Sequence, residues 1–324
     1  MISHDRWAVL ELDRDVRDML AGLDTVLPEP FHRLGVAGAR RAVAALRPST
    51  GDPVPEVSEV SIPGRHGPIP ARIYRPEDAA GSSIVYFHGG GWTMGGLDGA
   101  DACCRRLANL TRSTVISVDY RLAPEHKFPI PVDDCFDAVT WWSEHDRASG
   151  PIALAGDSAG ANLAIAVCLR ARDAGGPAFA AQLLAYPVFD DPRQHASFVE
   201  YQDGPLLMAA DVLFFLSNYL RDEMDLLAPE AIPSRSTTLA GLPPAIVVTA
   251  SHDPLRDGAE AYIPALLGDG VPAELLRVPG TVHGFFTEVG SLGGADRAVE
   301  AVAAFARIRF AESMTYRDRT STIL

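Results

Sequence analysis

The sequence predicts an α/β protein with a mostly parallel, doubly wound sheet of eight strands that is covered by helices on both faces. Short strand-like runs alternate along the chain with longer helix-like runs, which is typical of repeated strand–helix–strand units. The run at 245–250 is almost wholly apolar, as expected of a strand that is buried on both faces of a parallel sheet. A length of 324 residues allows one large domain of this class or two average ones.

The elements follow one another in a regular order, with one interruption. Residues 1 to about 48 are predicted as amphipathic helices that Pro28 and Pro30 interrupt, followed by a linker rich in proline and glycine. The segment 190–235 carries no strand pattern but holds an apolar helix over 206–220, and the polar residues 313–324 are expected to fray. Strands are predicted near 57–62, 70–75, 83–88, 114–119, 152–156, 181–186, 245–250 and 273–278, and the other helices near 99–112, 132–147, 159–173, 256–268 and 296–311.

Charge and composition exclude several classes of protein. The chain has 28 Lys and Arg against 42 Asp and Glu, a formal net charge of −14, so nucleic acid and anionic membranes are not expected partners. The N-terminus lacks the apolar region of a signal peptide, and no apolar run approaches the ~18 residues needed to span a bilayer. The four cysteines have no C-x-x-C spacing, which favours reduced, buried thiols in a cytoplasmic protein.

The segment 156–160 reads Gly-Asp-Ser-Ala-Gly and lies between a predicted strand and a predicted helix. In that context G-x-S-x-G indicates a nucleophile elbow, a sharp turn that presents the serine. Glycines are needed on both sides because a side chain there would collide with the strand or the helix. Ser158 is therefore the predicted nucleophile, and the helix that begins at Ala159 would direct its N-terminal N–H groups toward developing negative charge.

A serine needs a base, and the base needs an acceptor that holds it in one tautomer. With this fold the partners are expected in the order Ser, Asp, His along the chain. His283 follows the last predicted strand, where catalytic groups of open α/β sheets lie, although it could be a surface histidine. Asp253 follows the strand at 245–250 and is preferred as the acid over Asp257, which should lie one turn into the next helix.

Negative charge on the reacting oxygen needs hydrogen-bond donors. The run His88-Gly-Gly-Gly-Trp92 follows a predicted strand, where such donors lie in this fold. The backbone N–H groups of Gly89, Gly90 and Ala159 are the predicted oxyanion donors. A phosphate-binding loop is the alternative, but the run fits neither G-x-G-x-x-G nor the Walker pattern. His88 is expected to brace the loop.

Together these segments resemble the hormone-sensitive lipase family of α/β-hydrolases, in its bacterial carboxylesterase branch. The segments Asp119–Glu125 and Gly241–Ala245 are also similar to that family, and the resemblance covers roughly residues 55 to 310. It implies the α/β-hydrolase fold, with a catalytic domain over 49–189 and 236–324 and a helical cap built from 1–48 and 190–235. Asp119, Arg121 and Glu125 would belong to the scaffold, as would Asp157.

The expected function is that of a serine carboxylesterase acting on small-molecule esters with short to medium acyl chains. Trp92, Leu206 and Phe214 are the candidate substrate-binding residues, although such side chains more often only pack a cap against a sheet. The histidines and cysteines lack ligand spacing, so no metal or cofactor is expected. An amide or acetyl hydrolase with the same mechanism and a non-catalytic receptor on a hydrolase scaffold remain alternatives, and the chain could form a homodimer.

Overall fold

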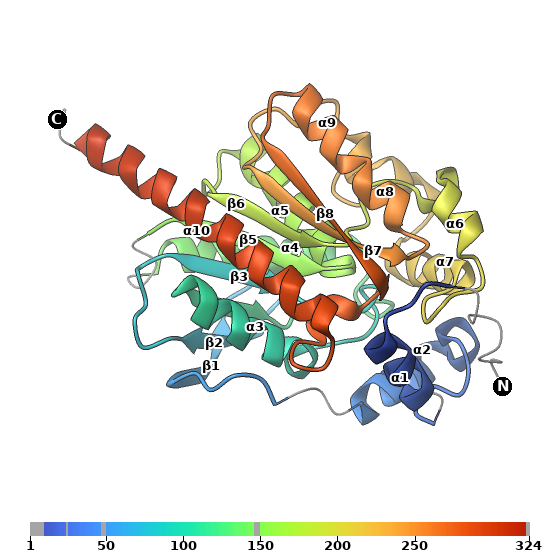
Figure 1. The fold of residues 1–324 in the computed structure, drawn as a ribbon. Helices are drawn as coiled ribbons and strands as arrows, with labels where there is room; N and C mark the ends of the chain where they lie inside the picture. The colour runs from blue at the N-terminus through green and yellow to red at the C-terminus, as the bar shows by residue number, and fades with distance from the viewer. Residues whose placement is uncertain (1–9, 24, 47–49, 146–149, 322–324) are drawn as a thin grey trace.

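The computed structural model describes residues 10–23, 25–46, 50–145 and 150–321. Its centre is an eight-stranded sheet with the order β1-β2-β4-β3-β5-β6-β7-β8 (Figure 1). The first two pairings, β1 with β2 and β2 with β4, are antiparallel, and every other pairing is parallel. The strands are β1 (Glu56–Ile62), β2 (Ile69–Arg75), β3 (Ser83–Phe87), β4 (Thr114–Val118), β5 (Ile152–Asp157), β6 (Ala181–Ala185), β7 (Ala245–His252) and β8 (Ala273–Val282).

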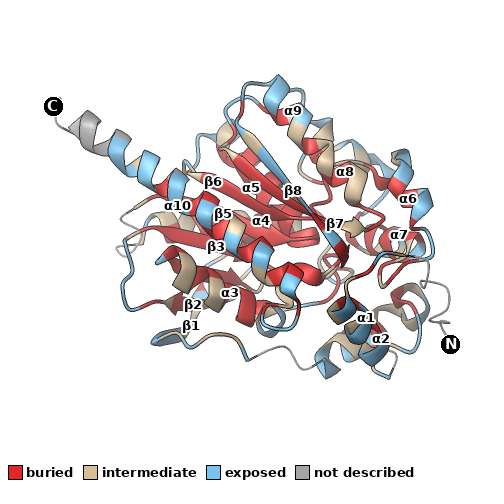
Figure 2. Ribbon diagram, in the orientation of Figure 1, coloured by how far each residue is buried: buried red, intermediate tan, exposed pale blue. Residues whose placement is uncertain are grey.

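Helices cover both faces of the sheet, as predicted. Successive side chains of a strand point to opposite faces, and β3 shows this clearly because Ile84 and Tyr86 pack into one buried cluster while Val85 and Phe87 pack into the other. The first cluster includes residues of α3 (Leu97–Thr111) and α10 (Gly293–Ser321). The second includes residues of α4 (Ile130–Ser143) and α5 (Ala159–Ala174). Figure 2 shows the result as buried central strands between helices whose outer faces are exposed.

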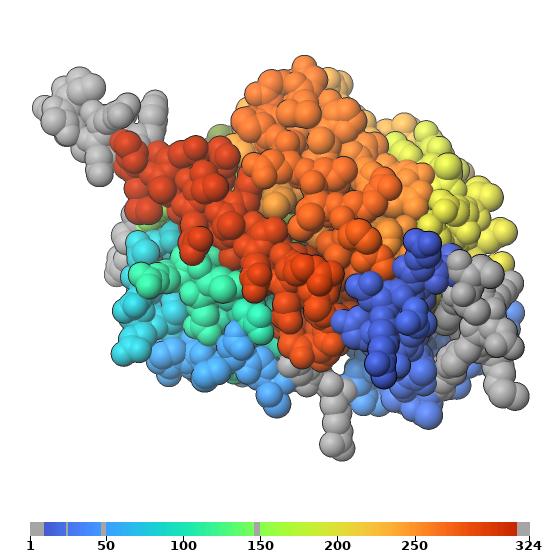
Figure 3. Space-filling model, viewed as in Figure 1, coloured from blue at the N-terminus to red at the C-terminus, as the bar shows by residue number. Residues whose placement is uncertain are grey.

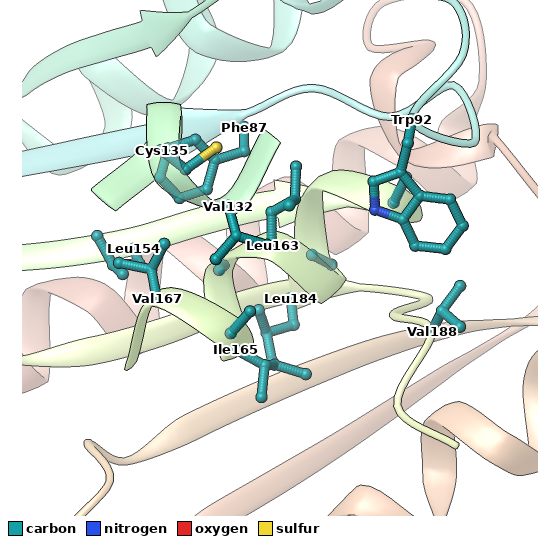
Figure 4. Packing of buried hydrophobic residues seen from close by; sticks show 14 of the residues in the cluster. Phe87, Trp92, Val132, Cys135, Leu154, Leu163, Ile165, Val167, Leu184 and Val188 are labelled. Carbon is teal, nitrogen blue, oxygen red and sulfur yellow. The ribbon is translucent and has the colours of Figure 1, made fainter. Parts of the chain in front are cut away.

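A large part of the core lies between the central strands and α5. Twelve residues of α5 are buried, so this helix is apolar around most of its circumference. Its side chains Leu163, Ile165 and Val167 belong to the same cluster as Leu154 of β5 and Leu184 of β6 (Figure 4). A helix buried in this way is held firmly on the sheet, which gives the turn between β5 and α5 a rigid support.

Four further helices gather where the parallel strands end. These are α1 (Arg14–Leu23), α2 (Phe31–Ala45), α6 (Ala196–Glu200) and α7 (Ala209–Tyr219). The segment around α1 lies against β8 and the start of α10, because the Asp13 N–H donates to the Gly280 carbonyl at 3.0 Å and the Gly293 N–H donates to Asp15 at 2.8 Å. Figure 3 shows this N-terminal segment directly beside the segment that follows β8.

Three predicted helices have different bounds in the structure. The helix expected over 256–268 is divided into α8 (Arg256–Glu260) and α9 (Tyr262–Gly268), because the Pro264 ring would clash with the Glu260 carbonyl in a continuous helix. The helix expected over 206–220 begins only at Ala209, since Leu206 adopts a φ of +65°. The fraying expected from residue 313 is wrong as far as Ser321, where α10 ends.

All four cysteines are buried free thiols, as predicted. Each lies on a helix that packs against the sheet: Cys103 and Cys104 on α3, Cys135 on α4 and Cys168 on α5. Burial raises the pKa of the Cys103 and Cys168 thiols well above the ordinary value. These side chains therefore act as small apolar core residues.

Candidate active site

Ser158 lies at a tight turn between β5 and α5. Its φ is +53°, a region that residues with a Cβ rarely adopt and that costs roughly 1–3 kcal/mol. The Ser158 N–H donates to the Ala185 carbonyl of β6 at 2.9 Å, which holds the turn onto the sheet. A Cβ on Gly156 would come within 2.5 Å of the Gly160 carbonyl carbon, and one on Gly160 would overlap the Phe87 carbonyl. Both glycines are therefore required by the close approach of the strand, the helix and β3.

Asp253 and His283 come together because β7 and β8 end side by side. His252 and Val282 are paired in the sheet, so the next residue of each strand leaves the sheet beside its neighbour. His283 Nδ1 lies 2.7 Å from Asp253 Oδ2, and His283 Nε2 lies 2.9 Å from Ser158 Oγ. A continuous hydrogen-bonded chain thus joins the three side chains that the sequence predicted.

Asp253, the carboxylate of this hydrogen-bonded series, is buried and is also bound by a backbone N–H group. The Asp253 side chain is fully buried, and its second oxygen accepts the Leu255 N–H at 2.8 Å. Asp257 lies elsewhere: it accepts the Ser197 N–H of α6 at 2.8 Å and pairs with Arg256 at 2.9 Å. The structure therefore brings Asp253 and not Asp257 to the histidine.

The ring of Tyr186 supports the histidine from β6. Its centroid lies 4.5 Å from that of the His283 ring, and its hydroxyl accepts the Phe286 N–H at 3.2 Å. Tyr186 follows β6 and so lies between the strand end that carries Ser158 and the strand ends that carry Asp253 and His283. Sequence reasoning missed this residue, although its place directly after a buried strand was the available signal.

The predicted oxyanion donors need one correction. The Gly89 N–H donates to Asp157 Oδ1 at 2.9 Å, so this group already has an acceptor within the protein. Within the described part of the chain, the N–H groups of Gly90, Gly91 and Ala159 donate to no protein acceptor, and all three residues line the cavity that contains Ser158. The donor set that the geometry offers is therefore shifted one residue along the glycine run, from Gly89 to Gly91.

Asp157 connects the glycine loop to the serine turn. Its Oδ1 accepts both the Gly89 N–H and the Tyr86 hydroxyl, the latter at 2.7 Å. Burial raises the pKa of this carboxyl, while the Tyr86 hydrogen bond opposes the rise. A Cβ on Gly89 would overlap the Asp157 carboxyl group. Asp157 is thus part of the scaffold, as predicted, but its partners are neutral donors and not charged groups.

His88 braces the loop from inside. Its Nδ1 lies 2.8 Å from the Gly89 carbonyl, and its ring stacks on Tyr120 with centroids 4.4 Å apart. Burial lowers the pKa of His88, which favours the neutral ring. Arg121 pairs with Asp134 at 2.7 Å, so that part of the 119–125 segment is held by ion pairs as the sequence suggested.

A cavity of about 1210 Å³ opens over Ser158 and His283. Trp92 and Leu206 line it, but Phe214 does not. Residues one position apart on a helix point about 100° apart, and on α7 it is Phe215 that faces the cavity. Its ring lies so close to Gly91 that a Cβ on that glycine would overlap it. The other apolar lining comes mainly from helices at the strand ends: Met19, Leu23, Leu27, Phe31, Val43, Leu207, Val212 and Leu216.

Two kinds of feature are absent from the described part of the chain. Histidine, cysteine and carboxylate side chains form no group of three that could hold a metal ion there. Across residues 10–23, 25–46, 50–145 and 150–321, no helix combines the length and the apolar character needed to cross a bilayer.

The chain is similar over most of its length to known hydrolases. A family model described as alpha/beta hydrolase fold matches residues 84–287. The carboxylic ester hydrolase LipN of Mycobacterium tuberculosis is 41% identical over 254 residues, which cover 75% of this chain and 67% of LipN. Esterase LipI of the same organism is 40% identical over 277 residues, which cover 82% of this chain and 85% of LipI.

Solved structures agree with these matches. A hyperthermophilic esterase from the archaeon Pyrobaculum calidifontis superposes with a TM-score of 0.83 at 39% identity, covering 91% of this chain and 98% of that one. The fold described above is therefore shared with an esterase over nearly the whole chain. The chain belongs to the α/β-hydrolase family, in the group resembling hormone-sensitive lipase that its motifs indicate.

Proposed function

We propose that this protein is a carboxylic ester hydrolase that works through an acyl-enzyme on Ser158. The observation that carries the proposal is the chain from Asp253 through His283 to Ser158, with 2.7 and 2.9 Å between its members, at the wall of a cavity. Distances of this size allow a proton to pass from the hydroxyl to the imidazole. The relatives named as esterases support the same reaction class.

The mechanism follows from the positions of these atoms. Ser158 Oγ attacks the ester carbonyl as His283 Nε2 takes its proton, and the imidazolium is stabilised by Asp253, which accepts the Nδ1–H. The oxygen that becomes negative accepts hydrogen bonds from Gly90, Gly91 and Ala159. His283 then gives its proton to the departing alcohol. Water, activated by the same histidine, releases the acid and restores the serine.

We further propose that α1, α2 and the segment 190–235 form a cap that limits the substrate to short and medium acyl chains. Support comes from the apolar side chains that these helices contribute to the cavity wall, such as Leu23, Phe31 and Phe215. A volume of about 1210 Å³ is large for a pocket of this kind and leaves room for an alcohol group as well as the acyl chain. Each CH₂ that is buried against such a wall contributes about 0.8 kcal/mol.

A labelling experiment combined with a substrate panel tests the proposal. A fluorophosphonate probe should label the wild-type protein and the Ser291→Ala variant, in which an exposed serine is changed, but not Ser158→Ala. p-Nitrophenyl esters of graded acyl length are measured beside the matching anilides, and the esters should be hydrolysed faster than the anilides. Absence of labelling would support a non-catalytic receptor, and faster turnover of the anilides would support an amidase.

A further inference from the structure

The glycine loop that offers Gly90 and Gly91 has a strained backbone, although the Thr93 N–H within it donates to the Gly90 carbonyl at 3.1 Å. Gly90, Gly91 and Trp92 have φ values of +114°, +59° and +55° in succession. The first two are accessible to glycine, but the third places a Cβ in the left-handed region at a cost of roughly 1–2 kcal/mol. A loop of this kind keeps one conformation only if surrounding groups determine it.

Contacts from three directions hold the loop. Phe215 of α7 lies over Gly91, and Trp92 stacks on Tyr219 with ring centroids 4.2 Å apart. From the 119–125 segment, the Ala123 N–H donates to the Trp92 carbonyl at 2.8 Å. The third contact comes from α2, where Arg40 Nε donates to the Thr93 carbonyl at 2.8 Å.

Arg40 joins the loop to a second segment at the same time. Its Nη2 donates to the Ala123 carbonyl at 2.9 Å, and its two terminal nitrogens reach the Glu125 carboxylate at 2.8 and 2.7 Å. The planar guanidinium can make these bonds together because its donors point in set directions. One side chain thus ties α2 to the loop and to the segment that holds the Trp92 carbonyl, and it lines the cavity as well.

We propose that Arg40 is a positioning residue for ester hydrolysis, holding the 88–93 loop so that the Gly90 and Gly91 N–H groups point at the oxyanion. This inference rests on the proposed function. Through Arg40, α2 contributes to the rate of the chemical step as well as to the wall of the cavity. Because Phe215 and Tyr219 still hold the loop from α7, loss of Arg40 should shift the donors and leave the fold intact.

Matched variants separate this role from a general effect on stability. Arg40→Met removes every donor and keeps most of the stem, while Arg40→Lys keeps the charge and part of the hydrogen bonding. Glu125→Gln removes the ionic partner but leaves the bonds to the Thr93 and Ala123 carbonyls. Arg41→Met is the control, because Arg41 is exposed on the same helix and does not line the cavity.

The first measurement is kcat and KM for p-nitrophenyl butyrate, with the concentration of active sites determined by titration with the fluorophosphonate. The second is the affinity of each variant for a trifluoromethyl ketone inhibitor and for the corresponding methyl ketone. The trifluoromethyl ketone forms a tetrahedral oxyanion adduct, whereas the methyl ketone binds mainly as a ground state. For Arg40→Met we expect kcat to fall by about 10- to 10²-fold with KM nearly unchanged. Trifluoromethyl ketone affinity should fall in parallel, and methyl ketone affinity should not. Arg40→Lys should recover part of both losses, Glu125→Gln should lose less, and Arg41→Met should match the wild type.

A wild-type kcat in Arg40→Met, with only a lower melting temperature, would overturn the inference and leave the proposed function standing. A wild-type protein that the fluorophosphonate does not label would contradict the proposed function itself. If Arg40→Met does not fold, Arg40→Lys and Glu125→Gln decide: parallel losses of kcat and trifluoromethyl ketone affinity support the positioning role, and unchanged values of both contradict it.

Discussion

Replacement of Asp253 by Asn should abolish most activity through the tautomer of His283. The Leu255 N–H, 2.8 Å from Oδ1, requires an acceptor, so the carbonyl oxygen of the introduced amide should turn toward it and leave the NH₂ group facing His283. That NH₂ donates to Nδ1 and moves the imidazole proton to Nε2, which then cannot accept the Ser158 proton. The loss in a comparable triad is ~10⁴-fold in kcat, or about 5.5 kcal/mol in the barrier.

Asp257→Asn is the matched control, because the same change is made four residues along the chain. Its amide oxygen can still accept the Ser197 N–H, so the main loss is the ion pair between Asp257 and Arg256, whose side chains are 28% and 14% exposed. We expect about 1 kcal/mol less stability and kcat within about twofold of the wild type. Both variants are assayed with p-nitrophenyl butyrate and by thermal unfolding. Opposite phenotypes, with Asp257→Asn nearly inactive and Asp253→Asn active, would refute the assignment of the acid.

Three further predictions concern the same site. Ser158→Ala should lower kcat by about 10³-fold or more without loss of stability. Adding His283→Ala should lower kcat little further, because the two residues act as a unit. A Ser158→Ala variant that keeps a tenth of the wild-type activity would exclude Ser158 as nucleophile. Activity should fall along a one-proton limb as the pH is lowered, because His283 must be neutral to accept the Ser158 proton. A flat rate down to about pH 4.5, with an intact fold, would argue against a histidine base. The ion pair between Arg40 and Glu125 stays formed over that range, because hydrogen bonds from Arg40 hold the pKa of Glu125 at about 2, below its ordinary 4.5. The stability from this pair is therefore present above pH 4.5 and is lost only as the pH falls toward 2. The wild type is expected to prefer acyl chains of about four to eight carbons, and Leu216→Ala should shift this preference to longer esters because it removes part of the cavity wall. Leu213 is 42% exposed on the same helix, so Leu213→Ala should leave the profile unchanged. A preference of the wild type for emulsified long-chain triglycerides would contradict the capped pocket.

Local pattern was sufficient for the fold class and for three site residues. Buried strands are short and apolar, and the helices between them are longer, so their order along the chain is enough to indicate a parallel sheet. Ser158, Asp253 and His283 each lie within a few residues of the end of a predicted strand, and in the structure each comes directly after β5, β7 or β8. Since parallel strands end at one edge of the sheet, residues in that place approach one another whatever the length of chain between them. The pairing of His252 with Val282 shows how strand register alone sets two of them side by side.

Tertiary contacts decided which groups of each motif face the cavity over Ser158 without a protein partner. Three glycines in a row look alike in sequence, and it is Asp157, 68 positions away, that takes the Gly89 N–H and leaves Gly90 and Gly91 free. The choice between Phe214 and Phe215 depends on the rotation of α7 about its axis, which its packing on the glycine loop sets. The link from Arg40 to the Thr93 carbonyl spans 53 positions and has no local signature. A sequence pattern reports what a residue's chain neighbours require, whereas hydrogen bonds between distant segments exist only after the chain has folded, and these bonds determine where each donor points.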